Sequence, residues 1–212
     1  MNRHYPFEKQ PLPFDYTALM PHCDPDTLYF HHAKIYTRNV DMLNYYIAPH
    51  NPYHSWSLEQ LIQDKLNLPV TSTNNIKHNA GSVYAHELYF NSINSKPSIL
   101  HGLLEKQIYE TYGSRSNFQS LLKQAAFSIL GSGWVWLVTE NGEDLHIITT
   151  QNNDIPQLNT QGNIFTLDMW EHAYYLIYPT KLGQYIDTIL KMIDWDNAEN
   201  RFLAFKNNNL EK

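Results

Sequence analysis

The sequence reads Asp168-Met169-Trp170-Glu171-His172-Ala173-Tyr174-Tyr175 where a predicted strand gives way to a predicted helix. A carboxylate and an imidazole, Asp168 and His172, are thereby placed in one turn whose backbone can hold both. Such a pair is half of a plausible metal site. Taken alone, the pattern also fits a helix cap at Asp168 and a packed or surface histidine at His172.

Two further histidines lie in predicted helices beside large apolar side chains. His31 follows Tyr29-Phe30, and His86 precedes Leu88-Tyr89-Phe90. A histidine in such surroundings needs a polar partner or a metal to offset the cost of burial. Each of the two, considered alone, also fits a hydrogen-bonded core histidine.

Composition limits the kinds of site that are possible. The chain has 212 residues, 42% of them hydrophobic, which is enough for a buried core. Its net charge of -6 argues against a nucleic-acid partner. Cys23 is the single cysteine, so thiolate zinc and iron–sulfur sites are excluded within one chain. A metal site must therefore use nitrogen and oxygen, and 11 histidines with 14% aromatic residues suit such a site.

The N-terminal segment bears on localisation. Met1–Pro6 lacks the uninterrupted apolar core of a signal peptide, and no later stretch is long and apolar enough to span a bilayer. We therefore expect a cytoplasmic protein without a membrane partner.

The first half of the chain is predicted to be helical. Asp24-Pro25-Asp26 has the composition of a helix start, and a helix is expected from about Asp26 to about Tyr46. Pro69 and the Thr/Ser/Asn cluster after it predict a break. The other expected helices are Leu58–Lys65, Ile76–Ile93, Leu100–Tyr112 and Asn117–Leu130.

The second half mixes strands and helices. Short β-branched or aromatic runs at 134–138, 145–149 and 163–167 predict three strands, and Asn141-Gly142 predicts a hairpin turn. Helix is expected from about Tyr174 to the end. The fold class is therefore α+β: an N-terminal α-helical hairpin domain, 1–95, and a C-terminal mixed α/β domain, 96–212, with a three-stranded antiparallel sheet flanked by helices.

Several motifs together carry a resemblance to a known family. The chain is similar to the iron/manganese superoxide dismutases over nearly its whole length. The most specific motif is D-x-W-E-H-A-Y-Y at 168–175. The others are Leu12-Pro13-Phe14, Ala18-Leu19-Met20-Pro21-His22, Tyr29-Phe30-His31-His32-Ala33-Lys34, Asn79-Ala80-Gly81-Ser82-Val83-Tyr84-Ala85-His86 and Gly131-Ser132-Gly133-Trp134-Val135-Trp136-Leu137.

The resemblance implies a cofactor and a reaction. One iron or manganese ion per chain would be held by the four expected ligands, and redox cycling of this ion would convert superoxide to oxygen and hydrogen peroxide, an antioxidant activity. Imidazole and carboxylate suit both metals, so the ligands do not choose between them. The expected ligands are His31, His86, Asp168 and His172, and the expected aromatic wall is Trp134, Trp136 and Trp170.

Departures from the family pattern lie around the metal. Asn39 takes the place of a gateway tyrosine eight residues after the first ligand; at about 100° per residue it should lie within roughly 80° of His31. Ile35 replaces a histidine that would pair with Tyr175 across an interface. The outer glutamine of the family is missing at both of its positions, Ser82 and Asn153. We expect catalytic roles for Asn39, Ser82, Asn153 and Tyr175, with Asn153 donating to solvent at the metal.

The resemblance also implies a partner subunit. Glu171 would cross a two-fold interface to hydrogen-bond a ligand histidine of the other chain, so a homodimer is expected and a tetramer stays open. An arginine expected near Thr180-Lys181-Leu182 is missing. Lys34, Arg38 and Lys181 are therefore the candidates for attracting the superoxide anion to a negatively charged protein.

Two functions follow from these observations. The first is an active superoxide dismutase; the alternative is a metal-binding homologue with weak or no dismutase activity, because the residues around the ligands have changed. A hydrolytic metalloenzyme fits less well, since no general base stands near the ligands. Asn152-Asn153-Asp154 and Ala80-Gly81 lean slightly towards the manganese pattern.

Overall fold

A computed structural model describes residues 4–210 of the chain. Residues 1–3, part of the N-terminal segment without a signal-peptide pattern, and residues 211–212, the end of the predicted last helix, lie outside this range. Helices occupy most of 25–90. They are α1 (Pro25–Tyr29), η1 (Phe30–Tyr36), α2 (Thr37–Ile47), the 3-10 helix η2 (Asn51–Tyr53), α3 (Leu58–Gln63) and α4 (Val70–Phe90).

The first long helix is formed by α1, η1 and α2 without interruption, which confirms the helix predicted there. Asp24 caps it by accepting a hydrogen bond from the Thr27 backbone N–H at 2.9 Å. The segment η1 is π-helical, with the Thr37 N–H bonded to the His32 carbonyl five residues earlier. Such a segment changes the direction in which successive side chains point, and it often occurs at functional sites.

Helix α4 begins earlier than predicted. The expected start at Ile76 was wrong, because Val70 already begins the helix and the Thr/Ser/Asn cluster lies within its first turns. Pro69 stands directly before the helix, where its missing N–H costs nothing. Ile76 is fully buried and α4 packs on both α2 and α3. This packing outweighs the weak helix propensity of the polar residues.

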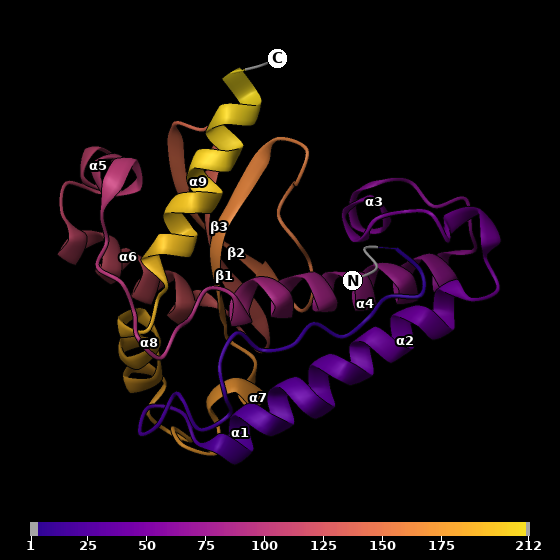
Figure 1. The fold of residues 1–212 in the computed structure, drawn as a ribbon, viewed down its shortest axis with the longest axis horizontal. Coiled ribbons are helices and arrows are strands. Elements are labelled where there is room, and N and C mark those ends of the chain that lie inside the picture. Colours follow the sequence, from indigo (N-terminus) through magenta and orange to yellow (C-terminus); the bar gives the residue numbers. More distant parts are fainter. Residues whose placement is uncertain (1–3, 211–212) are drawn as a thin grey trace.

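The C-terminal half places helices around one sheet (Figure 1). Its strand order is β2-β1-β3 and both pairs are antiparallel, as predicted. Helix α9 packs on β3, and α5 and α6 pack on β2. The elements are α5 (Gly102–Tyr112), α6 (Arg115–Ser128), β1 (Gly133–Glu140), β2 (Asp144–Gln151), β3 (Gln161–Asp168), α7 (Glu171–Tyr174), α8 (Leu182–Lys191) and α9 (Trp195–Leu210).

The hairpin between β1 and β2 turns where the sequence predicted. Asn141 has φ 54° and Gly142 has φ 75°, the left-handed pair that a tight hairpin of this kind requires. The central strand β1 is buried along nearly its whole length. Trp134 near its start pairs with Asp168 at the end of β3, so the sheet sets an aromatic ring beside the carboxylate.

The last helical region is divided, whereas one helix from about Tyr174 to the end was predicted; that prediction was wrong. Pro179 lies between α7 and α8. Between α8 and α9 the backbone bonds to another segment instead of continuing the helix: the Asp194 N–H donates to Ser92 O at 2.9 Å, and the Asn94 N–H donates to Met192 O at 2.8 Å. A helix cannot supply these groups, because its own ladder uses them.

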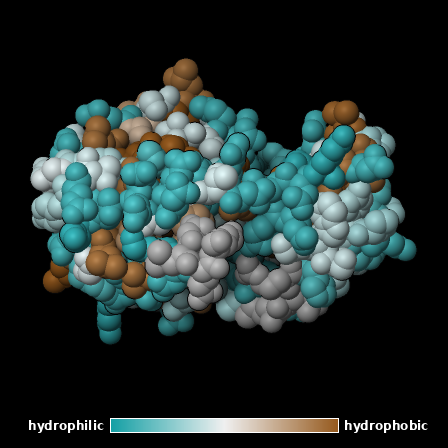
Figure 2. All heavy atoms as spheres, turned by 90° about the horizontal axis from the view of Figure 1, so that it is seen from above, coloured by the Kyte–Doolittle hydropathy of each residue, from teal (hydrophilic) through white to brown (hydrophobic). Residues whose placement is uncertain are grey.

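The α+β fold class is therefore confirmed: a helical N-terminal part is followed by a three-stranded antiparallel sheet with helices. In Figure 1, α2 and α4 run alongside each other, with α1 and α7 near one end of this pair. Within residues 4–210, no helix is long and apolar enough to cross a membrane. On the face shown in Figure 2, hydrophilic residues predominate and hydrophobic residues form separate patches, an ordinary distribution for a protein surface.

Candidate metal centre

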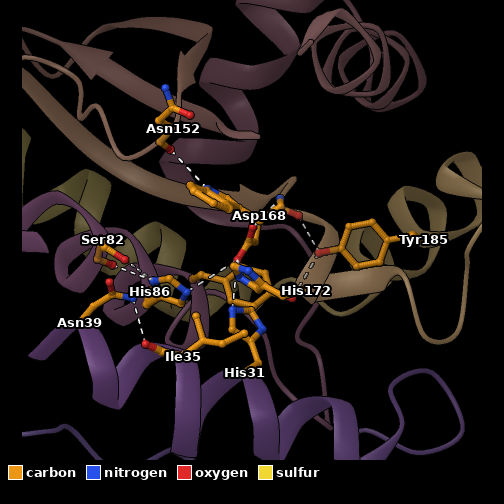
Figure 3. A network of polar contacts seen from close by, with 11 residues as sticks. His31, Ile35, Asn39, Ser82, His86, Asn152, Asp168, His172 and Tyr185 are labelled. Atoms are coloured by element: carbon orange, nitrogen blue, oxygen red, sulfur yellow. Dashed lines mark hydrogen bonds and ion pairs between the residues drawn. The ribbon is translucent and has the colours of Figure 1, made fainter. Parts of the chain in front are cut away.

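Four side chains from separate elements converge on one point (Figure 3). His31 comes from η1, His86 from α4, Asp168 from the end of β3 and His172 from α7. One ligand atom from each lies within 4.8 Å of all the others. The Asp168 Oδ2 atom is 3.0 Å from His31 Nε2, 3.1 Å from His172 Nε2 and 4.0 Å from His86 Nε2.

The strand-to-helix turn orients the carboxylate. The backbone N–H of Trp170 donates to Asp168 Oδ1 at 2.8 Å, which leaves Oδ2 directed towards the three imidazoles. The Tyr185 hydroxyl donates to the backbone carbonyl of Asp168 at 2.8 Å. His172 follows four residues later in the first turn of α7, so the same short segment positions two of the four ligand side chains.

The orientation of His86 is set by its own helix. Its Nδ1 atom lies 2.7 Å from the Ser82 backbone carbonyl, which can only accept, so Nδ1 carries the proton. The Ser82 hydroxyl is 3.3 Å from the same nitrogen. The unprotonated Nε2 of His86 therefore faces the other ligand atoms, as metal coordination requires.

The residues present fit a metal ion. His31, His86 and Asp168 are almost fully buried, at 3%, 1% and 0% exposure. The Nε2 atoms of His31 and His86 are buried without a hydrogen-bond partner. Buried polar atoms without partners are costly, and a cation between these nitrogens and the carboxylate would satisfy them. Three imidazoles and a carboxylate are suitable ligands for iron or manganese.

Burial also sets the protonation state of the ligands. It lowers the pKa of His31 to about 4 and the pKa of His86 to about 3. Burial alone would raise the pKa of Asp168, but attraction to His172, the hydrogen bond with His172 and the close approach of the His31 imidazole bring this pKa below its ordinary value. Neutral imidazoles and an anionic carboxylate are the forms that bind a metal.

These pKa values predict how the stability of the metal-free protein depends on pH. As pH falls from about 6.5 towards 4, the histidines protonate in the unfolded chain while His31 and His86 resist protonation in the folded one. The free energy of unfolding should therefore change little between about pH 7 and 8 and fall by several kcal/mol as pH falls across this window. Urea unfolding at a series of pH values measures it.

A matched pair of variants identifies the source of this pH dependence. His86→Leu should reduce the slope, because it removes one buried imidazole. His22→Gln is the control, because it removes an exposed histidine that is not among the four ligands. Equal slopes in the wild type and His86→Leu would contradict the assignment.

Aromatic rings surround the imidazoles. Around His31 stand Tyr89 and Phe90, with ring centroids at 5.4 and 4.9 Å. Trp134 lies 5.1 Å from His86, and Trp170 stacks on His172 at 5.7 Å. Such a shell excludes water and strengthens electrostatic interactions inside it.

Of the predicted aromatic wall, Trp134 and Trp170 contact ligand rings directly. Trp136 lies one layer further out, against Trp134 at 6.2 Å, and its Nε1 atom donates to Thr150 Oγ1 at 2.9 Å. Tyr89 and Phe90, which the sequence analysis treated only as apolar neighbours of His86, belong to the same shell.

The four expected catalytic positions differ in their surroundings. Ser82 touches His86, as described above. The Asn39 Nδ2 atom donates to the Ile35 carbonyl on its own helix at 2.9 Å. Asn153 is buried, and its Nδ2 atom lies 3.1 Å from His78 Nε2. Tyr175 is 53% exposed. The catalytic roles of these residues stay predictions.

Two residues near the site were missed by sequence reasoning. The hydroxyl of Tyr185 holds the Asp168 backbone and lies 3.4 Å from the hydroxyl of Tyr89. In sequence it resembles an ordinary buried position of an amphipathic helix. His78 stands eight residues before His86 with Ser82 midway, a spacing that places all three on one side of a helix. This spacing was a signal that could have been used.

Two family models match the chain. The alpha-hairpin domain of iron/manganese superoxide dismutases matches residues 6–94, and the C-terminal domain of the same enzymes matches residues 100–201. The chain belongs to the iron/manganese superoxide dismutase family. His31, His86, Asp168 and His172 form its iron or manganese site.

Curated relatives of both metal types align with nearly the whole chain. A manganese superoxide dismutase of Thermus thermophilus is 33% identical, covering 93% of this chain and 98% of its own length. A manganese superoxide dismutase of Escherichia coli is 34% identical, covering 92% of this chain and 97% of its own length. An iron superoxide dismutase of Synechococcus elongatus is 38% identical, covering 93% of this chain and 98% of its own length. Similarity to both types leaves the metal of this family member open.

Proposed function

We propose that the protein is an active dismutase that converts superoxide to oxygen and hydrogen peroxide with one iron or manganese ion per chain. The observation that carries the proposal is the convergence of three imidazoles and one carboxylate within 4.8 Å in a buried aromatic shell. When bound, the ion supplies a one-electron couple that oxidises one superoxide and reduces the next.

The ligand residues favour this chemistry through charge and protonation. Asp168 supplies a negative charge that favours the more highly charged state of a bound ion. Its Oδ1 atom is held by the Trp170 backbone, so the carboxylate cannot rotate freely. The Ser82 carbonyl keeps the Nδ1 proton on His86. The rings of Trp134 and Phe90 limit the access of water to these groups.

The substrate anion must approach a protein of net charge -6. Lys34, Arg38 and Lys181 are exposed, and we assign the attraction of superoxide to them. Lys34 also lies 5.6 Å above the ring of Tyr29, which restrains its position. Steering of this kind weakens as ionic strength rises.

A metal-binding homologue with weak activity is the alternative, and one observation favours it. The amides of Asn39 and Asn153 are both bonded to other protein groups, Ile35 and His78. One of the two N–H groups of each amide is therefore already used, which leaves only the second to replace a proton-donating tyrosine or glutamine.

A superoxide decay assay separates the two functions. Purified protein with its iron and manganese quantified is exposed to pulsed superoxide. Catalytic decay proportional to metal content supports an active dismutase. One ion per chain with negligible catalysis would exclude it and leave the metal-binding homologue.

Replacing Asn39 by tyrosine probes proton delivery. The variant gains a hydroxyl on a half-buried side chain, so turnover limited by proton supply should become several-fold faster at high superoxide flux. Pulse radiolysis over a range of superoxide concentrations measures this. Asn39→Phe is the control, because it adds the ring without the hydroxyl. Equal rates for the two variants would show that proton delivery at this position is not limiting.

We also propose that the protein is a homodimer, with a tetramer left open. Glu171 is exposed at the start of α7, and α7 packs against α1. Large apolar side chains are exposed on the same two elements and their continuations: Tyr29, Phe30, Tyr175 and Leu176, at 40 to 71%. Glu171 would reach the partner's metal site from this surface.

Replacing Glu171 by alanine tests the interface. We expect the dimer to dissociate at least tenfold more readily, since a carboxylate buried against the partner would be lost. Analytical ultracentrifugation over a concentration series measures this. The control is Glu143→Ala on the hairpin, whose side chain is 75% exposed beside Lys206. A dimer unaffected by Glu171→Ala would remove this residue from the interface.

Two further proposals concern organisation and location. The division into 1–95 and 96–212 is supported by the separate family models that end at 94 and begin at 100. Limited proteolysis that cleaves between them would support it. A cytoplasmic location remains a prediction, which cell fractionation would test.

A further inference from the structure

His78 lies on the same side of α4 as two residues of the metal centre. His78, Ser82 and His86 follow one another at four-residue spacing, which places them along one side of the helix. His86 is a ligand and Ser82 bonds to it. His78 is exposed, two turns from the ligand, and borders a surface pocket of about 450 Å³ that also contains Asn153.

The loop that carries Asn153 is held between α4 and the metal centre. On one side, the Trp170 indole, which stacks on His172, donates to the Asn152 carbonyl at 3.3 Å. On the other side, the Asn153 carbonyl lies so close to Gly81 that a Cβ atom there would be 2.1 Å from it. The loop therefore cannot shift without disturbing either the ligand helix or the Trp170–His172 stack.

The two ends of the Asn153 amide have different surroundings. The Nδ2 atom lies 3.1 Å from His78 Nε2 on the surface side. The Oδ1 atom is buried and has no hydrogen-bond partner. Because the backbone of the loop is held, rotation of the amide is the remaining way to exchange the group that faces inward.

The bond to His78 decides this orientation. An imidazole nitrogen accepts a hydrogen bond when it is unprotonated and donates one when it is protonated. While His78 Nε2 accepts, Asn153 must present Nδ2 to it and direct Oδ1 inward. If the group at position 78 donates, Asn153 must present Oδ1 and direct its N–H groups inward.

We propose that His78 is a positioning residue for the metal centre: by accepting from Asn153 it selects which end of the amide faces the buried site. The inference rests on the proposed role of Asn153 beside the metal. An acceptor directed inward places the negative end of the amide dipole there, which favours the oxidised ion. A donor directed inward has the opposite effect and also supplies the hydrogen bond expected of the family's outer amide.

Substitutions of opposite hydrogen-bonding character test the proposal. His78→Glu accepts only and should keep the orientation seen here; His78→Lys donates only and should reverse it. In metal-loaded protein, His78→Lys should shift the equilibrium between the oxidised and reduced ion about tenfold towards the reduced form relative to His78→Glu, about 59 mV for one electron. Redox titration followed by visible absorption measures both the potential and the spectrum.

Charge alone also shifts a potential, so two controls are needed. Asn74→Glu and Asn74→Lys place the same charges in the same pocket, one helical turn before the position that bonds to the amide. The second control repeats both His78 substitutions in the Asn153→Ala background, where no amide can turn. The difference in reduction potential between the Lys and Glu variants is the quantity compared. The proposal requires this difference to be larger at position 78 with Asn153 present than in either control.

Three results would contradict the proposal. The positioning role of His78 would be overturned if the potential difference between the Lys and Glu variants were equal at positions 74 and 78. It would also be overturned if the difference at 78 were undiminished in the Asn153→Ala background. If Asn153→Ala alone leaves both potential and spectrum unchanged, Asn153 does not act on the metal, and its proposed role fails together with that of His78. Dismutase activity is not needed for any of these readings, so a weakly active protein can be tested in the same way.

Discussion

Asp168→Ala is expected to lose its metal and its dismutase activity together. The substitution removes the one negative charge among the ligands, so that only three neutral imidazoles remain to bind the cation. Loss of a residue that only supports a ligand costs about 10- to 100-fold in affinity, so loss of the ligand itself should cost more than a hundredfold. Metal content after dialysis against chelator, with superoxide decay on the same samples, measures both.

Two comparisons make this result specific. Asp168→Asn keeps the shape of the side chain and the hydrogen bond from the Trp170 backbone but removes the charge. If the charge holds the ion, its metal content and activity should fall nearly as far as those of Asp168→Ala. Asp187→Ala removes a half-exposed aspartate paired with Lys123 at 2.7 Å and should retain metal and activity. Full metal occupancy in Asp168→Ala would refute the ligand assignment.

Gly81→Ala is expected to destabilise the protein, although helix propensity alone predicts the reverse. Alanine is favoured over glycine inside a helix by roughly 1 kcal/mol. Here the added Cβ would lie 2.1 Å from the Asn153 carbonyl oxygen and 3.3 Å from Ile155 Cγ1. The backbone must move, and we expect a net loss of about 1 to 3 kcal/mol in the free energy of unfolding. Urea unfolding measures it.

Gly183 offers the matched control in helix α8. A Cβ there meets Phe127 Cζ at 3.4 Å and Lys123 Cε at 3.6 Å, which are ordinary contacts with side chains. Gly183→Ala should therefore stabilise the protein by about 0.5 to 1 kcal/mol. Because Gly81→Ala also displaces the loop of Asn153, it should change the visible spectrum of the metal-loaded protein. Stabilisation by both substitutions would show that the loop yields more easily than the contacts indicate.

Much of the fold could be predicted from local patterns. The three strands and the Asn141-Gly142 turn were found because alternation, β-branching and the left-handed turn are local properties. The start of α4 and the division of the last helix were not. Both depend on distant partners: α4 is stabilised by helices packed around it, and the backbone near Asp194 bonds to the segment containing Ser92.

The ligands and their surroundings differ in the same way. Asp168 and His172 could be paired from sequence because one turn holds both. His31 and His86 lie in helices that any pattern would assign to a core, and only the similarity to a family joined them to the site. The role of Asn153 at the metal stays a prediction. What the sequence did not indicate is its contact with His78, which is 75 residues away along the chain.

Residue types and local spacing were enough to predict the fold class, the nitrogen and oxygen character of the site and the pairing of Asp168 with His172, whereas the motifs shared with the family added His31 and His86. Tertiary structure alone decided what the atoms beside the ligands do. The close approach of Asn153 to Gly81 and the direction of the Asn153 amide arise where separate segments meet. The direction of a hydrogen bond between distant groups depends on their positions in space, and no local pattern contains them.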